Sequence, residues 1–520
     1  MTEARGGRAV IEASQASQVR GAGPGKRGIP ALPPLIALTV TAVLLAVSGR
    51  YGYHRDELYF LRGGQEPAFG YLDQPPLTPL LARAMSAVFD GSLVGLRLPS
   101  ALMAGLVVLL TGWMTRELGG GRGAQALAAG CVAVSALLLV VGHLLSTTTF
   151  DLLAWTALSW LLIRALRDGG PIWLAAGLVA GVGLQNKTLM AFLLAGMGIG
   201  LLLAGPRQVL RGRWPWLGTL LAVLIWTPNL IWQAGHGWPL FELSATIASG
   251  GSGTSEPRWL LLPFQLVLIS PLLVPVWVAG LYRFARDPAL RPYRAIAVAY
   301  PVLAAVFLVT GGKPYYLAGL YPVLLAAGAE PTLRWVRAGR SAVQARLRVG
   351  LLAAAVALSL AVNAVLMLPL VPARQLAGTP IVAINYDAGE TLGWPEFTRT
   401  LAGVAAALPG AERATAIVLA GNYGEAGAVD RFGAELAVPP AYSGYHGYGD
   451  WGPPPESSGT TIAVGYPEER LREWFGSVEL AARIDNGVGV PNDEQGRPVW
   501  LCRNRLAPWA AIWPTLLRRA

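Results

Sequence analysis

Apolar runs separated by short polar segments dominate the first 371 residues of the chain. A helix needs roughly 20 apolar residues to cross a bilayer, so these runs predict eleven membrane-spanning helices. Gln185, Asn186 and Lys187 interrupt one long run. We interpret that run as a helical hairpin, because a hairpin returns Arg207 to the membrane face of Arg167. The predicted spans lie at residues 31–49, 93–114, 123–142, 150–166, 171–186, 189–205, 214–232, 259–281, 294–310, 314–330 and 350–371.

The pattern changes after residue 371, where the apolar runs become short. Bounded by turn residues, they predict buried strands at residues 380–384, 416–420 and 461–464. Helices are predicted at 396–407 and 468–475, and a loop rich in Tyr, Gly, Trp and Pro at 439–455. The last apolar segment, 509–517, is too short to cross a bilayer, and we expect it on the membrane surface. Alternating strands and helices predict a small α/β domain.

Composition supports a membrane protein, because only 14% of the residues are charged and 53% are hydrophobic, whereas a soluble domain has about 25% charged residues. The net charge of +11 comes from arginines grouped between the apolar runs, which is the pattern of cytoplasmic loops and not of a nucleic-acid groove. We therefore predict a multi-pass plasma-membrane protein that binds no nucleic acid. Its parts are a disordered cytoplasmic N-terminus (1–30), a transmembrane core (31–371) and an extracytoplasmic α/β domain (372–520).

The most distinctive polar segment is the predicted outer loop at residues 50–92, between the first two spans. Carboxylates at a membrane edge are costly and usually functional. Asp56 and Glu57 are adjacent, and like charges this close raise the proton affinity of one carboxylate, which suits a general base. The alternative is an ordinary solvated loop whose charges lie beside arginines. The other predicted substrate-loop residues are Arg55, Tyr59, Asp73, Gln74 and Pro75.

Lysine is scarce in this chain, and two of its three lysines, Lys187 and Lys313, fall at predicted outer edges, where cations are disfavoured. A phosphate group held there would explain both lysines, although snorkelling to the lipid headgroups is the alternative. Tyr315 and Tyr316 follow Lys313 closely and join it in the predicted phosphate site. Asp151 opens the fourth predicted span on the same side, where it is either a second catalytic carboxylate or a helix cap. No metal-ligand spacing occurs, so no metal site is predicted, and a requirement for a divalent ion stays open.

These segments together resemble the GT-C glycosyltransferases, over about residues 31–330. The resemblance rests on the Asp56-Glu57 pair after the first span, the acid at the fourth span, and two motifs: Tyr-x-Asp-x-Pro-Pro-Leu at 71–77 and Lys-Pro-Tyr-Tyr-Leu at 313–317. The nearest branch contains the protein O-mannosyltransferases and the aminoarabinose transferases that modify lipid A. In the latter, a lysine occupies the position of Gln74, so the resemblance argues against the same substrate.

The resemblance implies an inverting glycosyltransferase that moves a sugar from a polyprenyl-phosphate donor to an envelope lipid, glycan or protein at the outer membrane face. Asp56 would be the base or would orient the acceptor, and Asp151 would be the second carboxylate. Lys313, helped by Lys187, would neutralise the phosphate leaving group. The lipid-linked sugar is a substrate, and no cofactor is implied with certainty.

Two other classes of function remain open from the sequence. Polar residues at the 185–187 break could line the path of a transporter for a small solute or lipid-linked intermediate. Against a transporter, no two halves of the chain share matched broken spans, and the outer loop is large. A non-catalytic anchoring protein, whose C-terminal domain binds partners, is the third hypothesis.

Overall fold

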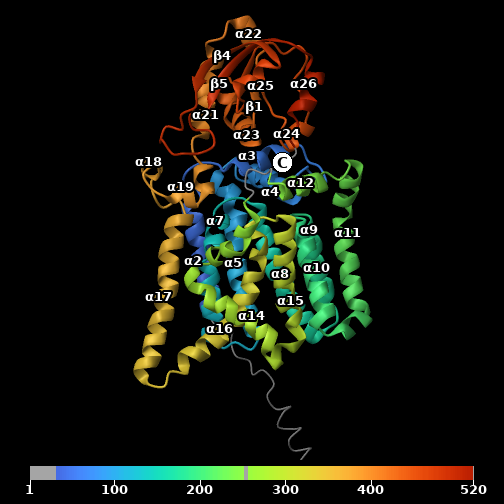
Figure 1. Ribbon diagram of the computed structural model, residues 1–520, viewed down its shortest axis with the longest axis vertical. Coiled ribbons are helices and arrows are strands. Elements are labelled where there is room, and N and C mark those ends of the chain that lie inside the picture. The colour runs from blue at the N-terminus through green and yellow to red at the C-terminus, as the bar shows by residue number, and fades with distance from the viewer. Residues whose placement is uncertain (1–30, 251–255, 519–520) are drawn as a thin grey trace, which may run out of the picture.

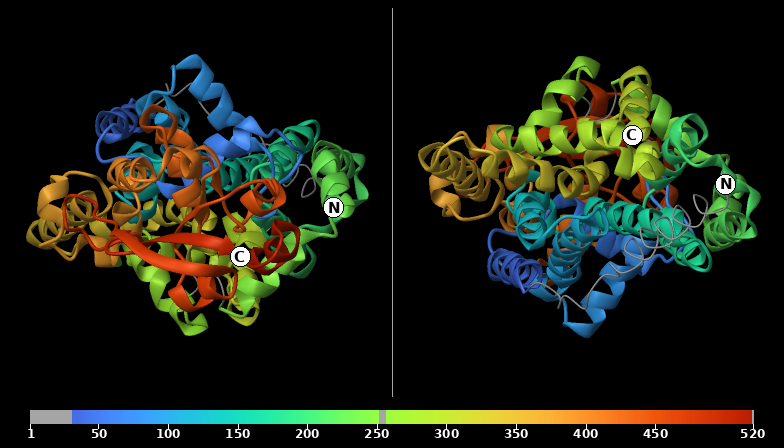
Figure 2. Two further views of the ribbon diagram at one scale, coloured as in Figure 1. Left: turned by 90° about the horizontal axis from the view of Figure 1, so that it is seen from above. Right: turned by 90° about the horizontal axis from the view of Figure 1, so that it is seen from below.

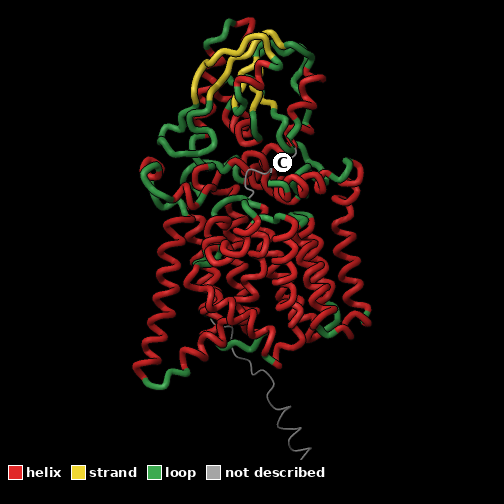
Figure 3. Tube along the Cα trace, in the orientation of Figure 1, coloured by secondary structure: helices red, strands yellow, loops and turns green. Residues whose placement is uncertain are grey.

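The computed structural model describes residues 31–250 and 256–518. A helical bundle forms one end of the molecule, and a domain containing all the described strands forms the other (Figures 1 and 3). Five helices among the described residues are long and apolar enough to cross a membrane. These are α5 (Leu93–Glu117), α8 (Thr147–Asp168), α11 (Arg213–Gly235), the segment Pro288–Thr310 formed by η4 (Pro288–Tyr293) and α15 (Arg294–Thr310), and α17 (Ala342–Met367).

Two bent pairs of helices also pass this test, so that the described chain has up to seven candidate crossings if each pair is one span. The first pair is α6 (Arg122–Ala133) with α7 (Ala136–Gly142), bent by 59°. The second pair is bent by 77° between Arg258–Val267 and Pro271–Arg286. Its first part consists of η2 (Arg258–Leu260) and α13 (Leu261–Val267), and its second part of η3 (Pro271–Leu273) and α14 (Val274–Arg286). The rest of the bundle consists of α2 (Leu32–Val47), α9 (Ile172–Leu184), α10 (Leu189–Ala204), η1 (Arg207–Arg211), η5 (Pro314–Leu320) and α16 (Tyr321–Arg337).

Helices therefore occupy all eleven predicted ranges. Because at most seven candidate crossings meet the length and composition criterion, the total of eleven crossings stays a prediction. The 171–205 segment is divided into α9 and α10 at the predicted polar break. Close helix packing depends on glycine: a Cβ atom at Gly280 of α14 would lie 1.8 Å from the Leu324 carbonyl oxygen of α16. Small residues at such crossings let two backbones approach closely, which is how helices associate in a membrane.

The two bent crossings contact each other at their breaks. The Asn363 side chain on α17 donates hydrogen bonds to the carbonyl oxygens of Val134 and Ile269, each at 2.8 Å. The Ala136 N–H also donates to the Ile269 carbonyl oxygen, at 3.1 Å. Irregular backbone inside a membrane needs internal hydrogen-bond partners, and these contacts provide them.

A layer of short helices lies between the bundle and the strand-containing domain (Figure 1). It contains α3 (Arg55–Gln65) and α4 (Leu77–Val88) from the predicted outer loop, α12 (Pro239–Ala248), and α18 (Ala373–Leu376), α19 (Ile381–Ile384) and α20 (Tyr386–Gly389). Seen from above, the C-terminal domain lies across the end of the bundle (Figure 2).

The C-terminal domain contains a five-stranded sheet in the order β2-β1-β3-β5-β4. Its strands are β1 (Ile417–Ala420), β2 (Ala441–Tyr442), β3 (Thr461–Val464), β4 (Phe475–Arg483) and β5 (Pro498–Arg505). β1 pairs with β2 and β3 in parallel, whereas β5 pairs with β3 and β4 antiparallel. The helices of this domain are α21 (Trp394–Ala406), α22 (Gly410–Ala414), α23 (Tyr423–Phe432), η6 (Ala434–Leu436), α24 (Gly447–Asp450), α25 (Glu468–Arg472) and α26 (Trp509–Leu516).

Alternate residues of the buried strands face two different hydrophobic clusters, as strand geometry requires. Val418 and Ala420 of β1 face a cluster that also includes Leu58 and Tyr59 of α3. Ile417 and Leu419 face the opposite cluster, which includes α26. The first cluster is shared by the C-terminal domain and the outer loop, so α3 is packed as part of both.

Several local predictions for the C-terminal domain are wrong. Residues 380–384 form the short helix α19 instead of a strand, because Ile381 packs beside Leu376 and Val490 outside the sheet. The predicted helix 468–475 ends at Arg472, and Phe475 begins β4. The predicted loop 439–455 contains β2 and α24, and β4 and β5 were not predicted at all. The segment 509–517 packs on the sheet instead of a membrane surface, because its apolar side chains fill the second cluster.

Candidate active site

Helix α3 places Asp56 and Glu57 in its first turn. His54 caps this helix: its Nδ1 accepts a hydrogen bond from the Asp56 N–H at 3.2 Å, and the Glu57 Oε2 accepts one from the His54 N–H at 2.8 Å. This reciprocal cap satisfies two backbone donors that a helix start leaves free. The cap fixes where the helix begins, and thereby the directions in which the two carboxylates point.

Glu57 points into the protein and is fully buried. The Arg97 guanidinium donates to both of its carboxylate oxygens, at 2.8 and 2.7 Å, and the Leu145 N–H donates to Oε1 at 2.8 Å. Burial acts to raise the pKa of Glu57, but Arg97 and the N–H groups of Leu145 and His54 together outweigh it and hold the pKa below its usual value. These contacts tie Glu57 to the interior of the protein, and its predicted catalytic role stays a prediction.

Asp56 points the other way, and its side chain is 42% exposed. Its Oδ1 accepts a hydrogen bond from the Tyr423 hydroxyl of the C-terminal domain at 2.7 Å. Of the two adjacent carboxylates, Asp56 is the one that an incoming molecule can reach.

The other predicted substrate-loop residues divide into two groups. Asp73 lies near Asp56, and its Oδ1 accepts a hydrogen bond from the Tyr59 hydroxyl at 2.7 Å. Burial raises the pKa of Asp73. Gln74 and Pro75 are buried in the turn between α3 and α4, where the Gln74 carbonyl oxygen accepts from the Tyr71 N–H at 2.8 Å. These two residues shape the loop.

Arg55 faces the C-terminal domain. Its Nη1 lies 2.9 Å from the Tyr386 hydroxyl, 3.1 Å from Glu390 Oε2 and 3.0 Å from Asp493 Oδ2. Its guanidinium also covers the Tyr423 ring, 4.9 Å from the ring centroid. Arg55 thus joins the outer loop to the C-terminal domain.

The turn between α9 and α10 holds Lys187 against the outer loop. Thr78 of α4 donates to the Asn186 side-chain oxygen at 2.8 Å, and the Asn186 side-chain nitrogen donates to the Thr147 carbonyl oxygen at 2.8 Å. The Leu77 N–H donates to the Gln185 carbonyl oxygen at 3.0 Å. The polar break in the sequence is therefore the point where three segments are joined.

Lys187 and Lys313 lie within electrostatic range of Asp56. The Lys187 ammonium donates to the Thr148 hydroxyl at 3.3 Å and lies 5.1 and 5.8 Å from the ring centroids of Tyr315 and Tyr316. The two lysines are close enough for their charges to interact with each other and with Asp56. Burial lowers the pKa of both side chains. In Lys313, burial and the charge of Lys187 lower the pKa to about 8.

Asp151 is not a helix cap. Helix α8 begins at Thr147, one turn earlier than predicted, because the Ser146 hydroxyl accepts the Thr148 N–H at 3.1 Å. Asp151 is consequently a buried carboxylate inside the helix, close enough for its charge to act on Lys187. A nearby carboxylate favours the charged form of an amine, which here opposes the effect of burial on Lys187.

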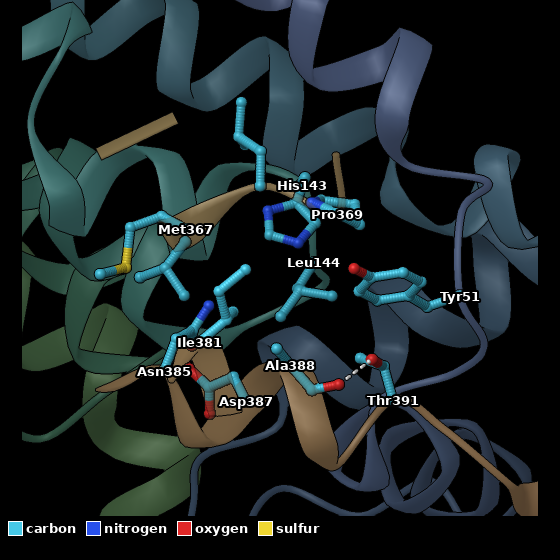
Figure 4. Close-up of a pocket in the computed structure, with 12 residues that line it drawn as sticks. Tyr51, His143, Leu144, Met367, Pro369, Ile381, Asn385, Asp387, Ala388 and Thr391 are labelled. Atoms are coloured by element: carbon cyan, nitrogen blue, oxygen red, sulfur yellow. Dashed lines mark hydrogen bonds between the residues drawn. The ribbon is translucent and has the colours of Figure 1, made fainter. Parts of the chain in front are cut away.

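A separate small pocket surrounds His143 at the end of α7 (Figure 4). Tyr51, Asn385 and Asp387 also line it, but Asp56 and the two lysines do not. Its volume of about 10 Å³ corresponds to roughly one water molecule, which is too small for a sugar. No group of His, Cys, Asp and Glu side chains within residues 31–250 and 256–518 could hold a metal ion.

Sequence reasoning missed Tyr423 and Arg97. The sequence did contain an indication for Arg97, because a charged residue inside a predicted span is usually paired with a second charged residue. The signal for Tyr423 was the motif Asn-Tyr-Gly-Glu-Ala-Gly at 422–427, whose glycines contact α3.

Comparisons with known proteins support the fold. The family model of dolichyl-phosphate-mannose-protein mannosyltransferases matches residues 73–232. Undecaprenyl phosphate-α-4-amino-4-deoxy-L-arabinose arabinosyl transferase 1 of Pseudomonas fluorescens (strain Pf0-1) is 28% identical over 356 residues. That alignment covers 60% of this chain and 59% of the relative, which is less than two thirds of the relative's length.

Crystal structures of ArnT from Cupriavidus metallidurans, in the apo state and bound to undecaprenyl phosphate, share the fold with a TM-score of 0.56 and 15% identity. These alignments cover 90% of this chain and 97% of ArnT, so the shared fold includes the C-terminal domain. By these matches the chain resembles the GT-C superfamily of polyprenyl-phosphate-sugar glycosyltransferases, and it shares the fold of ArnT.

Proposed function

We propose that this protein is an inverting glycosyltransferase that moves a sugar from a polyprenyl-phosphate donor to an envelope lipid, glycan or protein at the outer face of the plasma membrane. The proposal rests on one observation above all: two of the three lysines of the chain gather near the exposed carboxylate of Asp56. Donor phosphate and acceptor would meet between them.

Two neighbouring ammonium groups repel each other, and an anion placed between them removes that repulsion. The phosphate that leaves the sugar is already an anion, so it needs charge stabilisation instead of protonation. Lys187 is held for this task by Thr148 and by the rings of Tyr315 and Tyr316. The nearby Asp151 carboxylate counteracts the effect of burial on the pKa of Lys187.

Asp56 would act on the acceptor. As the carboxylate of the pair that is exposed, it takes the proton of an attacking hydroxyl or amine, or orients that group for attack. Asp73 and Tyr59 would line the acceptor side of the same space. Because Gln74 replaces the lysine of the aminoarabinose branch, the sugar transferred here would differ from aminoarabinose.

The orientation of α8 supports an outer-face site. Its first residues, Thr147 and Thr148, contact the Lys187 turn, whereas Arg167 near its other end pairs with Glu117. Arg283 donates to the Leu118 carbonyl oxygen at that same far end. Arginines concentrate on the cytoplasmic side of membrane proteins, which leaves the site and the C-terminal domain outside.

Removing either lysine should weaken binding of undecaprenyl phosphate, a probe that requires no knowledge of the sugar. We expect Lys187→Ala and Lys313→Ala each to raise its Kd about 10- to 100-fold, because a hydrogen bond to a charged group contributes about 1.5–3 kcal/mol. Binding to the purified protein in nanodiscs would be measured with Arg399→Ala, an exposed cation outside the site, as control. Undiminished binding in both lysine variants would refute the phosphate site.

The same binding should depend on pH. The pKa of Lys313 is lowered to about 8, so Lys313 is protonated at pH 7 and loses its charge as the pH rises through 8. The Kd for undecaprenyl phosphate should therefore rise between pH 7 and pH 9.5. Arginine does not deprotonate in this range, so Lys313→Arg should reduce this rise. An equal rise in wild type and variant would exclude Lys313 as its source.

A further inference from the structure

The motif at residues 422–427 builds a helix start at the carboxyl end of β1. The Asn422 side-chain oxygen accepts the Glu425 N–H at 2.9 Å, and Glu425 Oε2 accepts the N–H groups of Asn422 at 3.2 Å and Gly421 at 2.7 Å. This capping box fixes the first residue of α23, which is Tyr423.

The two glycines of the motif bring α23 against α3. A Cβ atom at Gly424 would lie 2.9 Å from the Arg55 Cβ, and one at Gly427 would lie 2.8 Å from the Leu58 Cβ. Any larger residue at these positions would separate the two helices. A Cβ atom at Gly403, on the exposed face of α21 in the same domain, would meet nothing within 4 Å, so this position has room for a methyl group.

The Tyr423 side chain is fixed on several sides. Its ring lies between the Arg55 guanidinium, at 4.9 Å, and the His446 ring, at 5.3 Å and an interplanar angle of 28°. The Tyr59 ring is 5.1 Å away. With the ring held in this way, the hydroxyl is directed at Asp56 Oδ1, 2.7 Å distant.

We propose that Tyr423 is a positioning residue for Asp56, so that the C-terminal domain completes the catalytic site. This inference rests on the proposed function of Asp56. By donating to Oδ1, the Tyr423 hydroxyl holds the carboxylate in one orientation, in which Oδ2, 4.0 Å from His54 Nδ1, would face the acceptor. A reacting group held in place before the acceptor arrives avoids the entropic cost of being ordered during the reaction.

Tyr423→Phe keeps the ring and removes only the hydroxyl. We expect kcat for sugar transfer to fall about 10-fold or more, with the donor KM changed less than twofold and the Tm unchanged, because a 1 Å misplacement of a reacting group can cost as much as about 100-fold. Tyr448→Phe is the matched control, since it removes another tyrosine–aspartate hydrogen bond of this domain, to Asp430 at 2.6 Å. It should retain wild-type kcat.

Gly427→Ala tests the same contact through the backbone. The added methyl group should push α23 from α3, move the Tyr423 hydroxyl from Asp56 and lower kcat, whereas Gly403→Ala should not. If wild-type protein transfers no sugar from any polyprenyl-phosphate donor, the proposed function itself fails. If wild type is active and Asp56→Asn is inactive, but Tyr423→Phe keeps its kcat or loses kcat only together with Tm, the proposal for Tyr423 alone is overturned.

Discussion

Replacing Asp56 by Asn is expected to lower kcat for sugar transfer by about 10²–10⁴-fold, the usual contribution of a general base. Asn has nearly the same shape, and its side-chain oxygen can still accept the hydrogen bond from Tyr423. What it lacks is the capacity to take a proton and the negative charge. Transfer would be measured in membrane vesicles by mass spectrometry of envelope lipids, glycans and proteins, after a strain without the gene has shown which fraction loses a sugar.

The matched control for this substitution is Glu66→Gln, which neutralises an exposed carboxylate at the far end of the same helix. It should transfer sugar at the wild-type rate. Binding of undecaprenyl phosphate to Asp56→Asn should stay within about threefold of wild type, because the carboxylate acts on the acceptor and not on the phosphate. Wild-type transfer by Asp56→Asn would remove Asp56 from the reaction. Together with intact transport of a solute, it would favour the transporter hypothesis.

The main parts of the site could be predicted because they depend on local patterns. Apolar runs set the helices, and the arginine clusters fix which helix ends lie together. Those two patterns alone predict that Asp56, Lys187 and Lys313 lie at one end of the bundle. The scarcity of lysine was the decisive signal, since lysine at an outer edge opposes the usual distribution of charge.

What could not be predicted depends on contacts between distant parts of the chain. The capping box orients the two carboxylates locally, but the burial of Glu57 depends on its partner Arg97, 40 positions away. Tyr423 lies 367 positions from Asp56. The strand β4 was missed because much of it is exposed and its sequence includes Gly, Glu and Ala, which are uncommon in strands.

The buried pair of Arg97 and Glu57 should have the largest effect on stability. Arg97→Leu is expected to lower the free energy of unfolding by about 3–5 kcal/mol, because it leaves an uncompensated carboxylate in the interior. Arg97→Lys should be almost as destabilising, since one ammonium cannot replace the planar guanidinium fork. That fork also donates to the carbonyl oxygens of Ser48 and Gly52, at 2.6 and 2.7 Å. Unfolding would be followed in detergent by intrinsic fluorescence.

The double variant Arg97→Leu/Glu57→Leu distinguishes the effect of the unpaired charge on stability from the effect of the hydrogen bonds to backbone groups. If only the unpaired charge mattered, removing both partners would restore most of the stability. The pair, however, also satisfies the N–H groups of His54 and Leu145 and the carbonyl oxygens of Ser48 and Gly52. We therefore expect the double variant to recover only part of the loss, and to lose sugar transfer because α3 no longer has its cap. Full recovery of stability would mean that these backbone groups find other partners, and that the pair does not hold Asp56 in place.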